Sequence, residues 1–330
     1  MPEKLNLFYE EPDPDRWLPY DRYIRKAVRR IVRGPSRPGG VMMVAFDLMR
    51  GLDKLGIPYR FNDYQHVKKN PCELIGVIGK PHLIFEKRFK NPIIFGAGVY
   101  SHPIDCPKLF EDYSNVKKML VPGPWMEQMC KPYYKDKVIS WPVGINTEVW
   151  NNDIKCNELL DFLIYDKIRW DHSTYEINLI NPIIKHLQQK GLSYQIIRYG
   201  HYTHTDLKRK LSVSKAVIFL CEHETQGLAY QQILATNTPI LAWNRAGYWQ
   251  DPSYFPHKVK YQPVSSVPYW SERCGSKFSD FKDFPDKLLE FLDLLNSGYF
   301  FPRNYILDNL TLEKSAALYL DIYNQVEKEL

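Results

Sequence analysis

The chain has 330 residues, a formal net charge of +6 and 25% charged residues. This length exceeds the roughly 250 residues that one hydrophobic core usually serves, so we expect two domains. The sequence has no run of about 18 uncharged apolar residues, and its acidic, proline-bearing start does not resemble a cleaved signal. The six cysteines form no CxxC pair, which argues against a zinc ribbon or a dense disulfide framework. These features favour a soluble protein of the reducing cytoplasm.

The first part of the chain alternates short apolar runs with helical patterns. Lys4–Tyr9 is predicted to be a strand, and Tyr20–Val32 is predicted to be a helix with arginines on one face. A breaker loop that ends at Gly40 leads to a predicted helix over Val41–Leu55, with Gly56 as its C-terminal cap. The further short apolar runs, expected as strands, are Ile57–Phe61, Leu74–Ile78, Leu83–Phe85, Ile93–Phe95, Lys118–Val121 and Lys137–Ile139.

A second alternation begins after Trp150. The predicted strands are Leu160–Tyr165, Tyr194–Tyr199, Ala216–Cys221 and Pro239–Ala242, and the predicted helices are Tyr175–Lys190, Thr205–Val213, Leu228–Ala235, Phe284–Leu295 and Leu312–Leu330. The aromatic and proline-rich stretch Val259–Lys277 has no clear period and is predicted to be a surface excursion. Alternation of this kind is typical of parallel sheets covered by helices, so the predicted class is α/β with two Rossmann-like lobes.

The end of the predicted strand at Cys221 is the most informative place for chemistry. Ligands of parallel sheets bind beyond the carboxyl ends of the strands, where helices begin. The N–H groups of Gly227, Leu228 and Ala229 start such a helix and suit a diphosphate. Glu224 would then face the group that the phosphate carries, and Gln232 could bind a ribose. The alternative is an ordinary strand-to-helix turn with an exposed glutamate.

This segment resembles the signature of the retaining glycosyltransferases of GT-B fold, family four. In that signature two glutamates, separated by seven residues, lead into a helix of small residues and a Thr-Pro strand. Gln232 stands where the family places the second glutamate, on the donor ribose. An amide still makes hydrogen bonds, but the lost charge is expected to weaken donor binding. The matching positions are Glu224, Gly227, Leu228, Ala235, Thr238, Pro239 and Ile240.

A second segment, Lys137–Trp150, is similar to the sequence that closes the N-terminal lobe in this family, with Asn146 in place of the usual aspartate. The resemblance implies a GT-B fold with two lobes facing across a cleft. The implied divisions are an acceptor-side lobe over 1–149, a nucleotide-sugar-binding lobe over 150–310 and a helix over 311–330 that returns to the first lobe.

The resemblance also implies roles for individual residues. Lys167 and Arg169 would bind the donor diphosphate, together with Gly40, Gly227, Leu228 and Ala229; the alternative for the two cations is an ordinary solvated strand end. Glu224, Thr225 and Gln226 would hold the donor sugar, and His102 would lie near it, unless it is merely a surface histidine. Tyr199, His201 and Tyr202 would contact the nucleobase, unless they only pack on their neighbours.

The expected activity is hexosyl transfer from a UDP or GDP sugar to a carbohydrate or lipid-linked acceptor, with retention and without a metal or another cofactor, as in polysaccharide biosynthesis. Two rival functions remain open: a catalytically weak nucleotide-sugar-binding or scaffold protein, suggested by Gln232, and a nucleic-acid-binding module, suggested by the arginine cluster. We expect no nucleic acid, because the cluster lies on one helix and has few interleaved aromatics. Arg22, Arg25, Arg29 and Arg33 share a helical face that is either simply solvated or attracted to an anionic membrane at the inner face.

Overall fold

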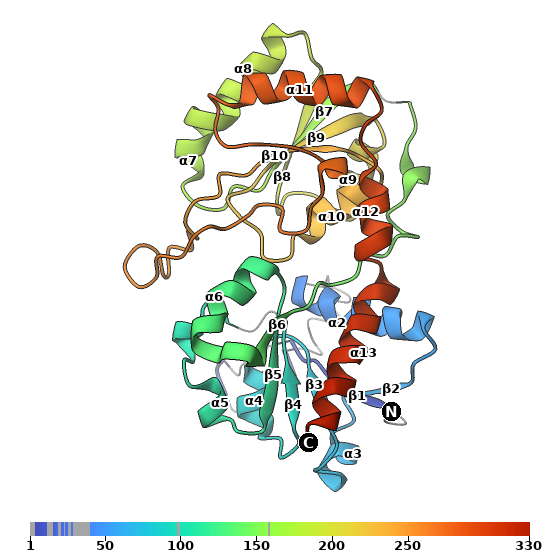
Figure 1. Cartoon of the computed structure of the whole chain (residues 1–330), viewed down its shortest axis with the longest axis vertical. Helices are drawn as coiled ribbons and strands as arrows, with labels where there is room; N and C mark the ends of the chain where they lie inside the picture. The colour runs from blue at the N-terminus through green and yellow to red at the C-terminus, as the bar shows by residue number, and fades with distance from the viewer. Residues whose placement is uncertain are drawn as a thin grey trace. The chain divides into compact units, whose positions relative to one another are not determined.

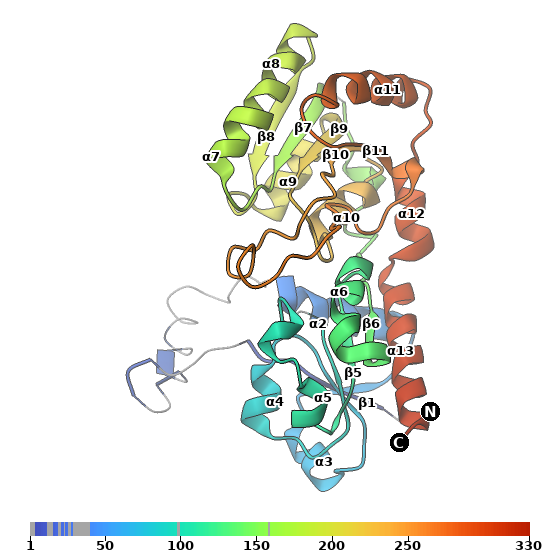
Figure 2. The same ribbon diagram turned by 60° about the vertical axis from the view of Figure 1, so that its left-hand side comes forward.

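The computed structural model describes residues 4–11, 16–18, 21–22, 24–25, 28, 40–97, 100–157 and 159–330. The chain forms two compact units (Figures 1 and 2). The first comprises the described residues of Met1–Pro122 with Glu127–Gly144 and Leu312–Leu330, and the second comprises Gly123–Met126 and Ile145–Thr311. The chain therefore passes between the two units more than once, and its last helix belongs to the first unit.

The first unit is built on a six-stranded parallel sheet with the strand order β2-β1-β3-β4-β5-β6. Its strands β3 and β4 are apolar and fully buried, as expected for parallel strands that are covered on both faces. The strand bounds are β1 Leu5–Phe8, β2 Tyr59–Phe61, β3 Ile75–Val77, β4 Ile93–Phe95, β5 Val116–Val121 and β6 Val138–Ser140.

The last helix of the chain, α13 (Leu312–Lys328), packs within the first unit against α2 (Gly40–Lys54). A Cβ atom added to Gly51 of α2 would lie 2.3 Å from the carbonyl oxygen of Leu312, so glycine permits the close approach of the two helices. The indole of Trp141 also donates a hydrogen bond to the carbonyl of Ser315 at 3.0 Å. The described helices of this part of the chain are α2 Gly40–Lys54, α3 Tyr64–Lys69, α4 His82–Lys87, α5 Leu109–Asp112, α6 Pro124–Tyr134 and α13 Leu312–Lys328, with short 3-10 turns at Pro103–Asp105 and Lys135–Lys137.

The prediction of a strand at Leu83–Phe85 is wrong, because these residues form part of α4. Leu83 and Ile84 are buried, whereas Phe85 is exposed. A three-residue apolar run is compatible with either structure, and its periodicity cannot distinguish them. The predicted arginine-rich helix falls mostly outside the described residues, which include only Arg22 and Arg25 of its arginines.

The second unit has a five-stranded parallel sheet with the strand order β11-β10-β9-β7-β8. The strands of this unit are β7 Leu160–Asp166, β8 Tyr194–Arg198, β9 Ser214–Leu220, β10 Ile240–Trp243 and β11 Gly275–Phe278. Its helices are α7 His172–Tyr175, a π-helical turn Glu176–Ile180, α8 Asn181–Gln189, α9 His204–Leu211, α10 Leu228–Ala235, α11 Phe284–Asn296 and α12 Pro302–Asn309, with 3-10 turns at Asn152–Ile154 and Glu272–Cys274. Helix α10 begins and ends at the predicted residues.

Strand β11 corrects the prediction that the whole of Val259–Lys277 is irregular. The strand begins at Gly275, whose φ is +144° and whose added Cβ would lie 1.9 Å from the carbonyl oxygen of Ile240 on β10. Only glycine fits this approach, and its lack of a side chain removes the apolar signal by which a strand is recognised.

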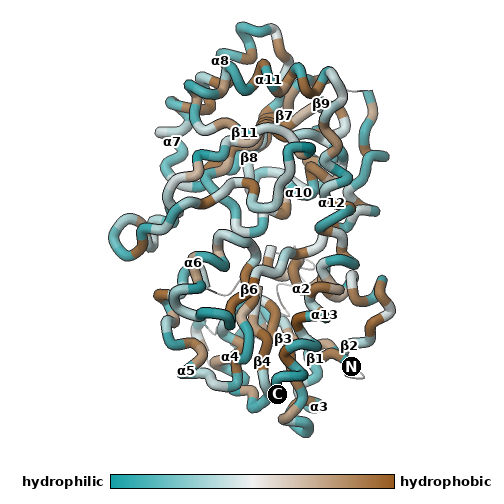
Figure 3. Tube along the Cα trace, viewed as in Figure 1, coloured by the Kyte–Doolittle hydropathy of each residue, from teal (hydrophilic) through white to brown (hydrophobic). Residues whose placement is uncertain are grey.

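Both faces of this second sheet are covered. Along β7, Phe162 and Ile164 belong to one hydrophobic cluster, and Leu163 and Tyr165 belong to the other. Figure 3 shows brown, hydrophobic trace in the central strands β7 and β9. Two parallel α/β sheets confirm the predicted fold class. Among the described helices, none combines the length and the hydropathy that a membrane span requires.

Candidate functional site

The candidate site lies at the switch point of the second sheet, where the chain adds β8 on one side of β7 and then β9 on the other side. Strand β7 pairs with β8 on one side and with β9 on the other, so the segments that follow β7 and β9 leave the sheet on either side of one point. Such switch points are where open α/β sheets bind their ligands. Lys167 and Arg169 follow β7, and Glu224 follows β9, so the fold brings together three residues that the sequence predicts for the donor site.

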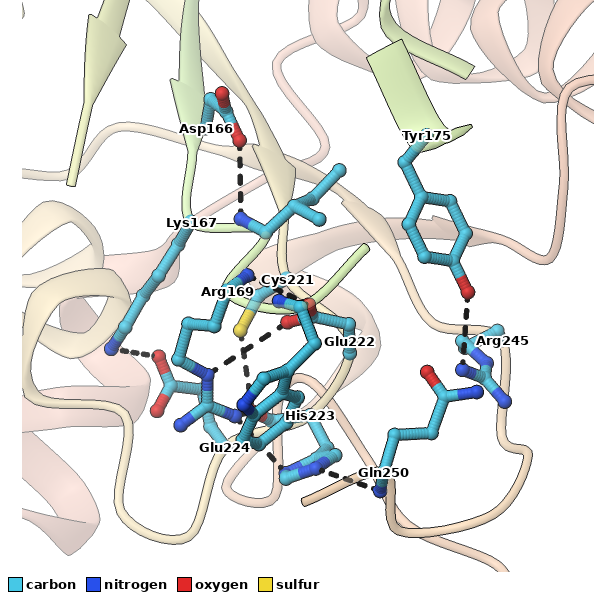
Figure 4. A network of polar contacts seen from close by, with 12 residues as sticks. Asp166, Lys167, Arg169, Tyr175, Cys221, Glu222, His223, Glu224, Arg245 and Gln250 are labelled. Atoms are coloured by element: carbon cyan, nitrogen blue, oxygen red, sulfur yellow. Dashed lines mark hydrogen bonds and ion pairs between the residues drawn. The ribbon is translucent and has the colours of Figure 1, made fainter. Parts of the chain in front are cut away.

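Lys167 and Glu224 form a buried ion pair at this point (Figure 4). Only 8% of Lys167 and 5% of Glu224 is exposed. Burial by itself disfavours the ammonium, but the carboxylate of Glu224 outweighs it and raises the pKa of Lys167 above its ordinary 10.5. The Lys167 ammonium also lies 4.5 Å from the centre of the Tyr199 ring. The site therefore holds a fixed positive charge next to a fixed negative one.

Glu222 anchors the loop after β7, a role that the sequence analysis did not assign. Its carboxylate accepts hydrogen bonds from the backbone N–H groups of Arg169, at 2.7 Å, and Trp170, at 2.9 Å. The Arg169 guanidinium in turn donates to the carbonyl oxygen of His223 at 2.8 Å. The loops after β7 and β9 thus hold each other in place. The alternating acid, histidine and acid of residues 222–224 is the signal that could have identified this arrangement.

His223 is packed among aromatic rings. Its ring centre lies 5.2 Å from that of Trp170 and 5.7 Å from that of Trp125. Burial, together with the positive charges of Arg169, Arg245 and Lys167, lowers the pKa of His223 from 6.5 to about 2. The imidazole is therefore neutral at physiological pH. It forms the uncharged, aromatic-packed centre of the loop after β9.

Trp125 reaches the same loop from 99 positions earlier in the chain, and its indole N–H donates to the carbonyl oxygen of Glu224 at 2.6 Å. Tyr261 donates its hydroxyl to the carbonyl oxygen of Trp125 at 2.9 Å. No local sequence pattern marks Trp125, because its role depends on a contact between distant segments.

A second polar cluster surrounds Asp166, the last residue of β7. The Asp166 carboxylate is buried and lies 2.7 Å from Nε2 of His172 and 2.6 Å from the guanidinium of Arg198. It also accepts the backbone N–H of Ile168 at 3.1 Å. Neither Asp166 nor His172 was predicted as a site residue, and a single acid at a strand end gives little signal in the sequence.

Gly227 makes the turn into α10. Its φ is +81°, and an added Cβ would lie 1.9 Å from the ring of Tyr230, so a side chain at this position would both strain the backbone and clash. Within the described part of the chain, the N–H groups of Leu228 and Ala229 have no hydrogen-bond partner. They remain able to bind an anion at the helix start, as predicted from the sequence.

The glutamines of this segment have different environments. The side-chain amide of Gln226 donates to Gln231 at 2.9 Å, and Gln231 donates back to the carbonyl oxygen of Gln226 at 2.8 Å. Gln226, predicted to bind the donor sugar, thus uses its amide to fasten the loop to α10. Gln232 and Thr225 are only partly buried. Gln232 lies one residue beyond the fully buried Gln231.

The three residues predicted for the nucleobase follow β8, which neighbours β7. Tyr199 is 47% exposed, and His201 is also exposed. The hydroxyl of Tyr202 is hydrogen-bonded to that of the buried Tyr165. Of the three, Tyr199 makes the direct contact with the Lys167 ammonium described above.

Gly40 and His102, the other predicted site residues, belong to the first unit. Gly40 begins α2. His102 is buried, and its Nδ1 accepts a hydrogen bond from the backbone N–H of Ile104 at 3.0 Å. Burial lowers the pKa of His102 below 6.5 despite the nearby Asp105. The histidine therefore caps a 3-10 turn, which is a structural use of its ring.

The sequence matches no protein-family model and no curated protein. Solved structures resemble the fold. Sucrose-phosphate synthase from Thermosynechococcus elongatus is 13% identical with a TM-score of 0.51, over 90% of this chain and 82% of the synthase. S. aureus TarM, solved with fondaparinux, α-GlcNAc-glycerol and UDP, is 13% identical with a TM-score of 0.52, over 85% of this chain and 59% of TarM.

The pneumococcal O-GlcNAc transferase GtfA, in complex with UDP and GlcNAc, is 10% identical with a TM-score of 0.50, over 79% of this chain and 59% of GtfA. These proteins are GT-B glycosyltransferases. The chain has the GT-B fold. This chain spans less than two thirds of the length of TarM and GtfA, and at these identities the likeness concerns the fold alone. The GT-B fold is the one that the sequence resemblance in residues 137–150 and 217–247 predicts.

Proposed function

We propose that this GT-B chain is a glycosyltransferase that moves a hexosyl group from a nucleoside diphosphate sugar to an acceptor hydroxyl. The observation that carries the proposal is the buried pair of Lys167 and Glu224 at the switch point of the second sheet, on the loop that leads to the available N–H groups of Leu228 and Ala229. A buried cation and helix-start amides suit a diphosphate, and a carboxylate beside them suits sugar hydroxyls.

In the proposed reaction, the bond between the sugar and the diphosphate breaks, and negative charge develops on the departing phosphate oxygen. Lys167 and Arg169 stabilise that charge more in the transition state than in the ground state. The acceptor hydroxyl attacks the same face of the sugar, its proton passes to the departing phosphate oxygen, and the configuration is retained. The reaction needs no metal and no other cofactor. Gln232 binds the ribose of a UDP or GDP donor.

The ion pair does not prevent either partner from binding the donor. A lysine ammonium has three N–H donors, and a carboxylate has two oxygens that accept hydrogen bonds. Lys167 can therefore keep Glu224 as one partner and direct other N–H groups to phosphate oxygens. The second carboxylate oxygen of Glu224 can accept a hydroxyl of the sugar. The pair orients both groups before the donor arrives, which lowers the cost of organising the site.

A second candidate function is a nucleotide-sugar-binding or scaffold protein of the same fold with weak turnover. Gln232 supports this alternative, since it offers the ribose a neutral amide instead of a charged carboxylate. Hydrogen bonds to charged groups contribute about 1.5–3 kcal/mol, against about 1 kcal/mol for neutral ones. Release of free sugar from the donor in the absence of acceptor would favour the enzyme, and donor binding without release would favour the scaffold.

Replacing Arg169 by alanine is expected to weaken the binding of a nucleoside diphosphate. The guanidinium is about one third exposed, so solvent screens its charge and we expect a loss of about threefold to tenfold. Isothermal titration calorimetry with UDP and GDP measures this loss and identifies the preferred base. Arg209→Ala, which removes an exposed arginine from α9 of the same unit, is the matched control. Unchanged affinity in Arg169→Ala would exclude this arginine from the diphosphate site.

We also propose that the first unit contacts an anionic membrane at the cytoplasmic face, where a lipid-linked acceptor would be found. Trp17 is 76% exposed and Leu18 is 69% exposed, and the nearby Ile24 and Val28 are exposed as well. Exposed apolar side chains beside arginines suit the interface of an anionic bilayer.

The expected result is sedimentation with vesicles of phosphatidylserine and phosphatidylcholine at low salt, and release at high salt because the electrostatic attraction is then screened. Vesicles of phosphatidylcholine alone should leave the protein in the supernatant. Replacing Trp17 and Leu18 by serine should reduce binding to the anionic vesicles. Failure to sediment with either vesicle at low salt would favour a soluble acceptor.

A further inference from the structure

A cavity of about 580 Å³ lies in the first unit, lined by residues of α3 and of the segment 87–91 between α4 and β4. Its size falls within the range of roughly 300–1,000 Å³ that small-molecule sites occupy. None of its lining residues belongs to the candidate site of the second unit, so the cavity needs a separate explanation. The lining residues are Tyr64, Val67, Lys68, Pro71, Lys87, Arg88, Phe89, Lys90 and Asn91.

The charged side chains that line this cavity are all basic, and one carboxylate, that of Glu10, lies behind them and accepts a hydrogen bond from the Tyr64 hydroxyl at 2.6 Å. Four of its lining residues are basic, and none is acidic. Lys87 is paired with Glu10 at 3.2 Å and lies 4.6 Å from the centre of the Tyr64 ring. The side chains of Lys68, Arg88 and Lys90 make no ion pair or hydrogen bond with any residue that the structure describes. Three cations around one cavity, without an acidic partner among the described residues, attract an anion.

The backbone at Arg88 is strained. Arg88 has φ +48° and ψ +51°, the left-handed conformation, at the point where α4 ends. This conformation is unfavourable for a residue with a Cβ, and glycine is the residue that adopts it readily at the end of a helix. An arginine at this position therefore has a steric cost that glycine would avoid. Strained residues cluster at ligand sites, where the side chain is needed despite the cost.

Aromatic rings and a fixed asparagine complete the cavity. The rings of Tyr64 and Phe89 lie nearly parallel, with centres 6.1 Å apart, and both rings pack on Phe8 of β1. The buried amide of Asn91 donates to the carbonyl oxygens of Asn70 and Glu73 at 2.9 Å and 3.0 Å. These contacts hold the two walls of the cavity together, so its rings and cations have a rigid base.

We propose that this cavity binds a phosphate monoester that carries a ring, with the phosphate on Lys68, Arg88 and Lys90 and the ring against Phe89 and Tyr64. Lysine and arginine side chains form charge-assisted hydrogen bonds with phosphate oxygens, and an aromatic face packs on either a base or the C–H face of a sugar. The site is independent of the proposed donor site, which lies in the second unit.

Arg88→Gly tests the proposal, because it removes the cation and also suits the left-handed backbone. The full chain is titrated with adenosine monophosphate and glucose 6-phosphate by calorimetry, with adenosine and glucose as uncharged controls. We expect both esters to bind and both uncharged compounds to bind at least about tenfold more weakly, since they lack the charged contacts. The tighter ester identifies whether the ring is a base or a sugar.

In Arg88→Gly, we expect binding of the esters to weaken about tenfold while the thermal midpoint stays the same or rises. Lys135→Gly is the matched control, because Lys135 is also a cation in the left-handed conformation, with φ +54°, and does not line the cavity. It should leave ester binding unchanged. Hydrogen exchange locates the ligand: residues 64–71 and 87–91 should gain protection. Protection confined to 222–232, ester binding equal in Arg88→Gly and the wild type, or no ester binding would overturn the proposal.

Discussion

Lys167→Met is expected to lower the free energy of unfolding of the second unit by about 3–5 kcal/mol, because it leaves the Glu224 carboxylate buried without its partner. Methionine keeps most of the apolar stem, so the loss reports the missing charge. Glu224→Gln, which leaves the ammonium without its charged partner, should cause a loss of similar size. The double variant should be more stable than the sum of the two losses implies, since it contains neither unpaired charge. Hydrogen exchange of amides in β7 and β9 measures these effects in the unit that contains the pair.

The same variants separate stability from function. Glu224→Gln should reduce turnover of a sugar donor more than it reduces binding of the bare nucleoside diphosphate, because the proposed partner of Glu224 is the sugar. Losses of turnover typical for one preorganised polar contact are about a hundredfold to a thousandfold. Equal losses in the two assays would show that Glu224 supports the loop and does not contact the sugar. If Lys167→Met and Glu224→Gln each caused only a small loss of stability, and the double variant lost their sum, solvent would be screening the ion pair.

The free energy of unfolding is expected to fall steeply as the pH decreases below about 6.5, and His223 is expected to contribute much of that fall. Its pKa is lowered from 6.5 to about 2 in the folded chain. Between these values the unfolded chain binds a proton at this imidazole and the folded chain does not, so protons favour unfolding. One such group changes the free energy of unfolding by about 1.4 kcal/mol for each pH unit.

The measurement is the pH dependence of urea unfolding in the wild type and in His223→Gln, between pH 7.5 and pH 4.5, where about 2–3 kcal/mol should separate the two profiles. Glutamine keeps an acceptor for the N–H of Gln250, which lies 3.4 Å from Nε2 of His223. Above about pH 7 the difference between the two proteins should be constant, because neither state then binds the proton. Parallel profiles over the whole range would show that His223 is protonated in the folded chain and that the aromatic packing around it opens.

The regular elements around the candidate site could be predicted from the sequence. Helix α10 follows from the apolar spacing after Gly227, and strands β7 and β9 follow from the apolar runs Phe162–Tyr165 and Ala216–Leu220, which the parallel sheet buries on both faces. Short elements were less predictable. The run at Leu83–Phe85 is helical, and β11 begins at a glycine that packs against β10.

The strand-end pattern of the sequence predicted Glu224 as a site residue, and the family resemblance predicted Lys167 and Arg169; the ends of parallel strands meet at one edge, so the three residues lie near one another. Their pairing, and the contacts of Trp125, Glu222 and His223 with the same loops, were decided only by the tertiary structure. Such contacts join residues up to 99 positions apart, and the charge of a buried side chain depends on all the groups around it. A local sequence pattern contains no information on long-range contacts or on the charge of a buried side chain. The residue types of the site could therefore be predicted from the sequence, but their electrostatic arrangement could not.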